Sequence, residues 1–218
     1  MSDDDRHSQA AEPELIADPD EKARVEAANG LKQFDQVINL VREWTEPERA
    51  FKLRVSMLLG LQRTALLGLT NYAGNFRPGA VKIGKSKHVP PGAHMVPELV
   101  EDMCDYVNSN FAQKTPVHLA AYVMWRLNWI HPFADGNGRT SRAASYFVLC
   151  VKSGHVLPGS NTIPEQIAQN KKPYYDALEA ADEHWRNGRL DLLRLEDLLS
   201  SALAKQLADY HRDATGVR

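Results

Sequence analysis

The stretch His131-Pro-Phe-Ala-Asp-Gly-Asn-Gly-Arg-Thr-Ser-Arg142 concentrates more reactive and ligand-binding residue types than any other part of the chain. It lies between two runs of apolar residues at helical spacing, 117–127 and 143–151, which predicts a loop that becomes the start of a helix. Glycines on both sides of Asn137 allow backbone N–H groups to approach a ligand closely. Because amides at a helix N-terminus attract anions, the stretch predicts an anion-binding turn.

The charged residues of this stretch fit the same interpretation. Arg139 and Arg142 are three residues apart and therefore share a face of the first helical turn, and guanidinium groups match the oxygens of phosphates. Asp135 offers a hard oxygen ligand for Mg²⁺, and His131 is a candidate general base at neutral pH. Taken singly, a histidine before a proline is usually a buried or capping residue, and Gly-Asn-Gly is usually a turn. Their combination favours transfer of a phosphorus-centred group from a polyphosphate to a hydroxyl.

Composition sets the broad class. The chain has 218 residues, 43% of them hydrophobic, and a formal net charge of −2, which predicts a single globular domain without non-specific binding to nucleic acid or membrane surfaces. No apolar run approaches the roughly 20 residues that span a bilayer, and the N-terminus lacks the pattern of a signal peptide. The only cysteines, Cys104 and Cys150, suit a reducing compartment. We therefore expect a cytoplasmic protein.

The charge is unevenly distributed along the chain. Residues 1–21 contain eight acidic residues and one arginine, a net charge of −7, whereas the remainder carries +5. The first segment is polar and has little to bury, which predicts a disordered acidic leader at residues 1–21. We expect a short helix at 22–30, the main domain at 31–205 and a C-terminal tail at 206–218.

Helical periodicity dominates the main domain and predicts an all-α fold. Thr115-Pro116 has the pattern of an N-cap followed by proline, Thr45 with Pro47 has a similar pattern, and Gly154 is a typical helix end. The exception is the turn-rich stretch after residue 74. Two short runs there, Ala80–Ile83 and Lys87–Val89, predict a small β-hairpin.

The stretch from His131 to Arg142 resembles the signature of Fic (filamentation induced by cAMP) domain proteins, H-x-F-x-[D/E]-G-N-G-R-x-x-R, and matches it at every fixed position. The segment Phe76-Arg-Pro-Gly-Ala-Val-Lys-Ile-Gly84 is similar to the hairpin that family members use as a flap over the active site. The segment Asn170-Lys-Lys-Pro-Tyr-Tyr-Asp-Ala-Leu178 resembles their nucleotide-side helix. The resemblance covers residues from about 30 to 200 and implies a helical Fic-type bundle with a hairpin flap.

The resemblance implies protein AMPylation, in which AMP moves from ATP to a Ser, Thr or Tyr hydroxyl of a target protein. It implies that His131 deprotonates the hydroxyl, Phe133 anchors the loop and Asp135 holds Mg²⁺. It assigns phosphate contacts to Gly136, Asn137, Gly138, Arg139 and Arg142. It assigns alignment of the target segment by strand-like hydrogen bonds to a flap made of Val81, Lys82, Ile83, Gly84, Lys85, Ser86, Lys87 and His88. Tyr174 and Tyr175 either flank the adenine or belong to the core.

Several alternatives share this motif. Gly138 disfavours the phosphate transfer of the related Doc branch, which has a lysine at this position. A donor such as UTP or CDP-choline, removal of AMP, and a catalytically idle adaptor or antitoxin-binding module stay open, although an intact His131 speaks against the idle module. Formation of a homodimer is also open.

Regulation is where the chain departs from the family. Many members carry an inhibitory helix with [S/T]-x-x-x-E-[G/N], whose glutamate pairs with the second motif arginine. At the corresponding place Asn29 fits the last position, but Arg24 replaces the hydroxyl residue and Ala28 replaces the glutamate. Glu26 is two residues away, about 200° around a helix, and is not expected to reach the same arginine. We hypothesise that residues 22–30 form an altered inhibitory helix that leaves Arg142 free, or that a separate antitoxin-like protein supplies the glutamate.

Overall fold

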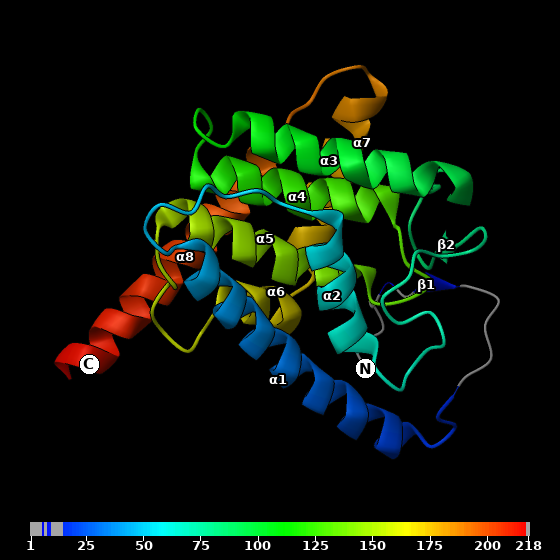
Figure 1. Cartoon of the computed structure of the whole chain (residues 1–218), viewed down its shortest axis with the longest axis horizontal. Coiled ribbons are helices and arrows are strands. Elements are labelled where there is room, and N and C mark those ends of the chain that lie inside the picture. Colours follow the sequence, from blue (N-terminus) through cyan, green and yellow to red (C-terminus); the bar gives the residue numbers. More distant parts are fainter. Residues whose placement is uncertain (1–5, 7, 10–14, 217–218) are drawn as a thin grey trace.

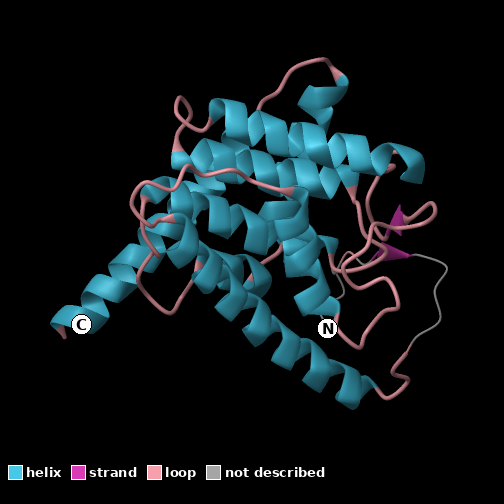
Figure 2. Ribbon diagram, viewed as in Figure 1, coloured by secondary structure: helices cyan, strands magenta, loops and turns pink. Residues whose placement is uncertain are grey.

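The computed structural model describes residues 6, 8–9 and 15–216 and shows an α-helical bundle with two very short strands (Figures 1 and 2). The described elements are β1 (Ser8–Gln9), α1 (Pro19–Trp44), α2 (Val55–Leu66), β2 (Lys82–Ile83), the 3-10 turn η1 (Ala93–Met95), α3 (Val96–Asn110), α4 (Pro116–Ile130), α5 (Asn137–Ser153), α6 (Ile163–Gln169), α7 (Lys172–Arg186) and α8 (Leu193–Thr215). The predicted all-α class is therefore confirmed.

Helices α4 and α5 form the centre of the bundle, and the other helices pack around them (Figure 1). Every residue from 119 to 127 of α4 is buried, as is every residue from 143 to 151 of α5. Helices that are covered on all sides carry few polar residues, in contrast to surface helices with one apolar face. This burial fixes both ends of the loop that joins α4 to α5, which is the stretch singled out in the sequence.

The helix caps at this centre follow the sequence. Thr115 caps α4, because its side chain accepts a hydrogen bond from the N–H of His118 at 3.1 Å. Gly154 ends α5 in the left-handed conformation, with φ at 84°. Thr45 was expected to start a helix, and that prediction is wrong. Its hydroxyl bonds to the carbonyl of Val41 as the C-cap of α1, and the next helix begins only at Val55.

Helix α1 is one continuous helix of 26 residues that includes both the expected short helix at 22–30 and the start of the main domain at 31. Asp18 caps it by accepting hydrogen bonds from the N–H groups of Asp20 and Glu21. Figure 1 shows it running across one side of the bundle toward the two strands. At the other end of the chain, the boundary expected at 206 falls inside α8, where Gln206 is fully buried.

The predicted β-hairpin is wrong. Lys82–Ile83 is a strand, but Lys87–Val89 is not, and the strand partner is Ser8–Gln9. The pairing is antiparallel, with Ser8 opposite Ile83 and Gln9 opposite Lys82. The prediction failed because Pro90 and Pro91 shorten the second run, while an open strand edge accepts any extended segment within reach. The disorder expected for the acidic leader does not hold at Ser8–Gln9, and residues 1–5, 7 and 10–14 lie outside the described residues.

No helix among the described residues is long and apolar enough to cross a membrane.

Candidate functional site

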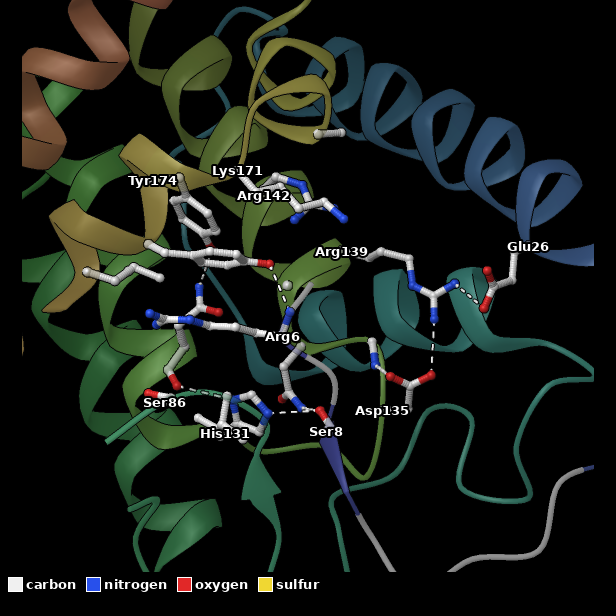
Figure 3. A pocket seen from close by; sticks show the side chains of 18 of the residues that line it. Arg6, Ser8, Glu26, Ser86, His131, Asp135, Arg139, Arg142, Lys171 and Tyr174 are labelled. Atoms are coloured by element: carbon white, nitrogen blue, oxygen red, sulfur yellow. Dashed lines mark hydrogen bonds and ion pairs between the residues drawn. The ribbon is translucent and has the colours of Figure 1, made fainter. Parts of the chain in front are cut away.

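A cavity of about 780 Å³ lies where the α4–α5 loop meets α1, α7 and the two strands (Figure 3). It brings together every residue of the motif that was expected to carry chemistry: His131, Asp135, Gly136, Asn137, Gly138, Arg139 and Arg142. Tyr174 and Tyr175 of α7 also line it. Its volume is in the range of about 300–1,000 Å³ that is usual for small-molecule sites.

His131 sits at the C-terminus of α4 in a left-handed conformation, with φ at 51° and ψ at 57°. A non-glycine residue rarely adopts this conformation, so the surrounding structure has to hold it. The buried Arg77 does so, since its Nε donates to the carbonyl oxygen of His131 at 2.8 Å while its other nitrogens donate to the carbonyls of Gly79 and Pro91. One arginine thus ties the segment before the strand β2 to the loop that joins α4 to α5.

The imidazole of His131 is held as a neutral base. Its Nδ1 lies 3.3 Å from the carbonyl oxygen of Asn128, which only accepts, so Nδ1 carries the proton and Nε2 keeps a lone pair. The pKa of His131 is lowered from its ordinary value of 6.5 to about 4, mainly by burial. The hydrogen bond to the Asn128 carbonyl and the charge of Asp135 oppose this shift, whereas the charges of His88 and Arg77 add to it. The Nε2 atom therefore stays unprotonated at neutral pH and can accept a hydrogen bond.

This burial predicts a specific acid sensitivity. Because the pKa of His131 is lower in the folded than in the unfolded chain, only the unfolded chain takes up this proton between pH 6.5 and 4, and stability falls as the pH falls through that window. His131→Gln should remove this contribution, about 1–2 kcal/mol between pH 7 and pH 5. Urea unfolding of both proteins at the two pH values measures it. An equal loss of stability in the two proteins would contradict the buried neutral state.

The loop itself is closed by Asn137 and Phe133. The Asn137 side chain accepts the N–H of Phe133 at 2.9 Å and donates to the carbonyl of Phe133 at 2.8 Å. The Phe133 ring is fully buried and stacks on Phe76, with ring centroids 6.0 Å apart. Gly136, with φ at 79°, is the N-cap of α5, and the first three residues of α5 line the cavity. The N–H groups of a first helical turn have no partner within the helix.

Asp135 and Arg139 of the motif take part in a connected series of hydrogen bonds and ion pairs. Asp135 accepts the N–H of Gly136 at 2.6 Å through one oxygen and pairs with Arg139 at 3.1 Å through the other. Arg139 also lies 3.5 Å from the carboxylate of Glu26 on α1 (Figure 3). Arg142 is engaged in an interaction of its own, so the expectation that it is free does not hold.

The two tyrosines of α7 differ. Tyr174 is 1% exposed, and its hydroxyl lies 2.7 Å from the Asn128 side chain and 3.3 Å from the Ser141 hydroxyl. Burial raises its pKa, so it remains a neutral hydrogen-bonding residue. Tyr175 is partly exposed, and the guanidinium of Arg6 lies 4.5 Å from the centre of its ring. Tyr174 thus belongs to the core as well as to the cavity wall.

The expected flap is only partly at the site. Ile83, Ser86 and His88 line the cavity, whereas Val81 is buried beneath the strand. Lys82, Gly84, Lys85 and Lys87 do not line the cavity. The ring of His88 fixes the end of this segment, with Nε2 2.7 Å from the carbonyl oxygen of Trp129.

The residues expected to mark the inhibitory position lie elsewhere. Ala28 is exposed and does not line the cavity, and Asn29 is buried with its amide donating to the carbonyl of Leu67 at 2.8 Å. The helix face that reaches the cavity is instead that of Pro19, Lys22, Ala23 and Glu26. Since Ala28 is about 200° around the helix from Glu26, the two residues face opposite sides.

The site fits a magnesium ion held by one protein carboxylate and by ligands that do not come from the protein. Among residues 6, 8–9 and 15–216 there is no group of three or more His, Cys, Asp or Glu residues suited to hold a metal. Asp135 is a single carboxylate with 46% of its side chain exposed at the cavity wall. One carboxylate together with water and phosphate oxygens is a usual set of ligands for Mg²⁺, so Asp135 would hold it.

Sequence reasoning missed three residues of this site. Ser8 and Arg6 line the cavity although they belong to the acidic leader, and Arg77 positions His131 from the flap segment. A single serine in a polar, acid-rich segment carries no periodicity or motif that marks it. Arg77 belongs to the segment that resembles the flap hairpin, but nothing in the neighbouring sequence indicates that its side chain is buried.

The chain is similar in sequence and in fold to known Fic proteins. "Protein adenylyltransferase Fic" of Drosophila willistoni is 37% identical over 114 residues, which are 50% of this chain and 20% of that protein. The chain thus spans about a fifth of the length of that relative. The crystal structure of a Fic domain containing signaling protein from Bacteroides thetaiotaomicron superposes with a TM-score of 0.71 at 22% identity, covering 92% of this chain and 76% of that one.

A second solved structure was determined with a nucleotide analogue. BepC from Bartonella tribocorum, with bound AMPPNP, superposes with a TM-score of 0.60 at 16% identity, covering 86% of this chain and 88% of that one. The sequence model described as "Fic/DOC family" matches residues 52–149, which include the motif from His131 to Arg142. With the complete motif assembled around one cavity, residues 52–149 of this chain belong to the Fic/DOC family.

Proposed function

We propose that the chain is a protein adenylyltransferase that transfers AMP from ATP to the hydroxyl of a serine, threonine or tyrosine. One observation carries the proposal: Nε2 of His131, held unprotonated, already accepts a hydrogen bond from a hydroxyl, that of Ser8, at 2.8 Å. Ser8 and His131 line the same cavity as Arg139 and Arg142. A base facing a hydroxyl beside a phosphate-binding wall is the arrangement that nucleotidyl transfer needs.

In the proposed reaction the target hydroxyl gives its proton to Nε2 of His131 as its oxygen attacks the α-phosphorus of ATP. The new bond joins the target oxygen to the α-phosphorus, the bond from that phosphorus to the oxygen bridging to the β-phosphate breaks, and pyrophosphate leaves. His131 then returns the proton to solvent. The carbonyl of Asn128 holds the ring so that Nε2 faces the hydroxyl throughout.

The remaining motif residues act on the phosphates. The N–H groups of the first turn of α5 and the guanidinium groups of Arg139 and Arg142 stabilise the negative charge that develops during transfer. Asp135 would hold Mg²⁺, which neutralises charge on the phosphates when bound. Arg139 has to change partners in this step, because it now pairs with Asp135 and Glu26.

The purified chain incubated with ATP and Mg²⁺, alone and with a cell lysate, tests the proposal. We expect protein adducts of the mass of AMP, measured by mass spectrometry, and parallel incubations with UTP and CDP-choline identify the donor. Strong adducts from UTP or CDP-choline, with none from ATP, would show that the enzyme uses that nucleotide and not ATP as its donor. Capture of a partner without transfer from any donor would reject the enzyme in favour of a binding module.

Glu26 is expected to restrain nucleotide binding weakly. Its contact with Arg139 is 3.5 Å long and its side chain is 40% exposed, so the pair should contribute no more than about 1 kcal/mol. Glu26→Ala should therefore tighten ATP binding by no more than about fivefold. Isothermal titration with a non-hydrolysable ATP analogue measures this change.

Two variants of the same helix serve as controls for Glu26. Glu21→Ala makes the same charge change at an exposed position outside the cavity, and Ala28→Glu adds a carboxylate to the opposite face. Neither should change nucleotide affinity. Weaker binding in Ala28→Glu would show that the inhibitory position is at residue 28 after all.

A further inference from the structure

The hydroxyl that meets the catalytic base belongs to the chain itself. Ser8 Oγ lies 2.8 Å from Nε2 of His131 and accepts a hydrogen bond from the side-chain amide of Asn137 at 3.2 Å (Figure 3). Because the amide nitrogen of Asn137 only donates, the Ser8 proton is directed at His131. The oxygen of Ser8 therefore stands between the base and the first residue of α5, where the anion-binding turn begins.

Backbone pairing fixes which residue reaches the base. Strand β1 pairs antiparallel with β2 so that Ser8 stands opposite Ile83, which itself lines the cavity. Alternate residues of a strand point to opposite faces, so a shift of one residue would turn the Ser8 side chain away from His131. This is strand addition to an open edge, the manner in which extended peptides are commonly bound.

Arg6 supplies a second attachment two residues earlier. Its guanidinium lies 4.5 Å from the centre of the Tyr175 ring and forms an ion pair with Glu179, and its backbone N–H donates to the Tyr175 hydroxyl at 3.4 Å. A cation over an aromatic ring and an ion pair together orient a segment more firmly than either contact alone. Ser8 is thus held between contacts to α7 and contacts to β2.

Space for a nucleotide remains beside the bound segment. The cavity of about 780 Å³ has Ser8 and Arg6 in its wall, and the same cavity is lined by Arg139, Arg142 and the glycines of the motif. The segment therefore forms part of the site and does not fill it. A segment that merely plugged the site would exclude the nucleotide.

We propose that Ser8 is a self-modification site, AMPylated in cis by the site that its own segment completes. This inference rests on the proposed function. Ser8 Oγ attacks the α-phosphorus of ATP and gives its proton to Nε2 of His131, the bond from the α-phosphorus to the bridging oxygen breaks, and pyrophosphate leaves. The product is a phosphodiester that links AMP to Ser8.

The test is peptide mapping of the full chain after incubation with ATP and Mg²⁺. We expect one AMP on Ser8, at a rate that does not change when the protein is diluted, because the tethered segment reacts within its own chain. Ser8→Ala should abolish this adduct and Ser8→Thr should retain it, while Ser2→Ala, a control within the same leader, should leave it intact. Ser8→Ala should label lysate proteins at least as fast as the native chain, because a competing hydroxyl is gone.

A mixing experiment separates cis from trans transfer. A His131→Ala chain, which keeps Ser8, is incubated with a Ser8→Ala chain, which keeps the base. Transfer in cis predicts no AMP on Ser8 of the first chain, and labelling there would overturn it. If lysate proteins are labelled but Ser8 of the native chain is not, the Ser8 proposal is wrong and the proposed function stands; if neither is labelled, the proposed function itself fails.

Discussion

His131→Ala is expected to lower the rate of AMP transfer about 10²–10⁴-fold, the usual contribution of a positioned general base. The variant removes Nε2, the atom that meets the hydroxyl, and leaves Arg139 and Arg142 in the cavity wall. The rate is measured from the appearance of the AMP adduct on the chain and on lysate proteins. Affinity for a non-hydrolysable ATP analogue should change little, because His131 is placed on the hydroxyl side of the cavity.

A matched control is His118→Ala. His118 is also a partly buried histidine with defined partners, since it bonds to Glu196 at 2.8 Å and to Tyr106 at 2.9 Å, but it does not line the cavity. It should alter stability and leave the transfer rate within a few fold. An equal loss of transfer in both variants would mean that reduced stability, and not removal of a base, causes the loss. Normal transfer in His131→Ala would show that His131 is not the general base.

Gly136→Ala should cost about 2–5 kcal/mol of stability and most of the transfer activity. Gly136 has φ at 79°, and a Cβ at this position would lie 2.2 Å from Cδ2 of the fully buried Leu66. The cost therefore combines a strained backbone, about 1–2 kcal/mol, with overpacking of about 1–3 kcal/mol. Because Gly136 is the N-cap of α5, relief of the clash should displace the first turn of α5, which lines the cavity. Urea unfolding and the transfer assay measure the two effects.

Gly154→Ala is a control that measures the cost of backbone strain without the cost of a steric clash. Gly154 has φ at 84°, but a Cβ there meets no atom within 4 Å, so only the backbone term of about 1–2 kcal/mol should be lost. Combining Gly136→Ala with Leu66→Ala should cost less than the sum of the two single variants, since the second removes the clashing methyl groups. Strict additivity would contradict the contact between Leu66 and residue 136.

Local features of the fold were predictable because they depend on neighbours in the sequence. Thr115 before Pro116 and Gly154 after an apolar stripe mark the ends of the two central helices, and cap geometry involves only a few consecutive residues. Thr45 shows the limit of such signals. The same residue type can cap either end of a helix, and packing of α1 decided which.

The grouping of the motif residues at one cavity was also predictable from the sequence. The motif places His131, Asp135, Arg139 and Arg142 within a single loop and helical turn, so any fold that forms α5 brings them together. The family follows from the same residues. The sequence left open whether Tyr174 belongs to the core or flanks a nucleotide. The structure shows that Tyr174 is buried and also borders the cavity.

Contacts between distant segments were decided only by the tertiary structure. Ser8 and His131 are 123 residues apart, and the strand partner of Lys82–Ile83 comes from the leader and not from the next residues along the chain. Glu26 reaches Arg139 because the orientation of α1 on the bundle selects which face meets the cavity. Periodicity indicates which residues a helix or strand can bury. Which distant segment packs against that face depends on the packing of the whole bundle. The sequence by itself therefore determined the residues of the motif, and the tertiary structure decided which hydroxyl and which carboxylate meet them.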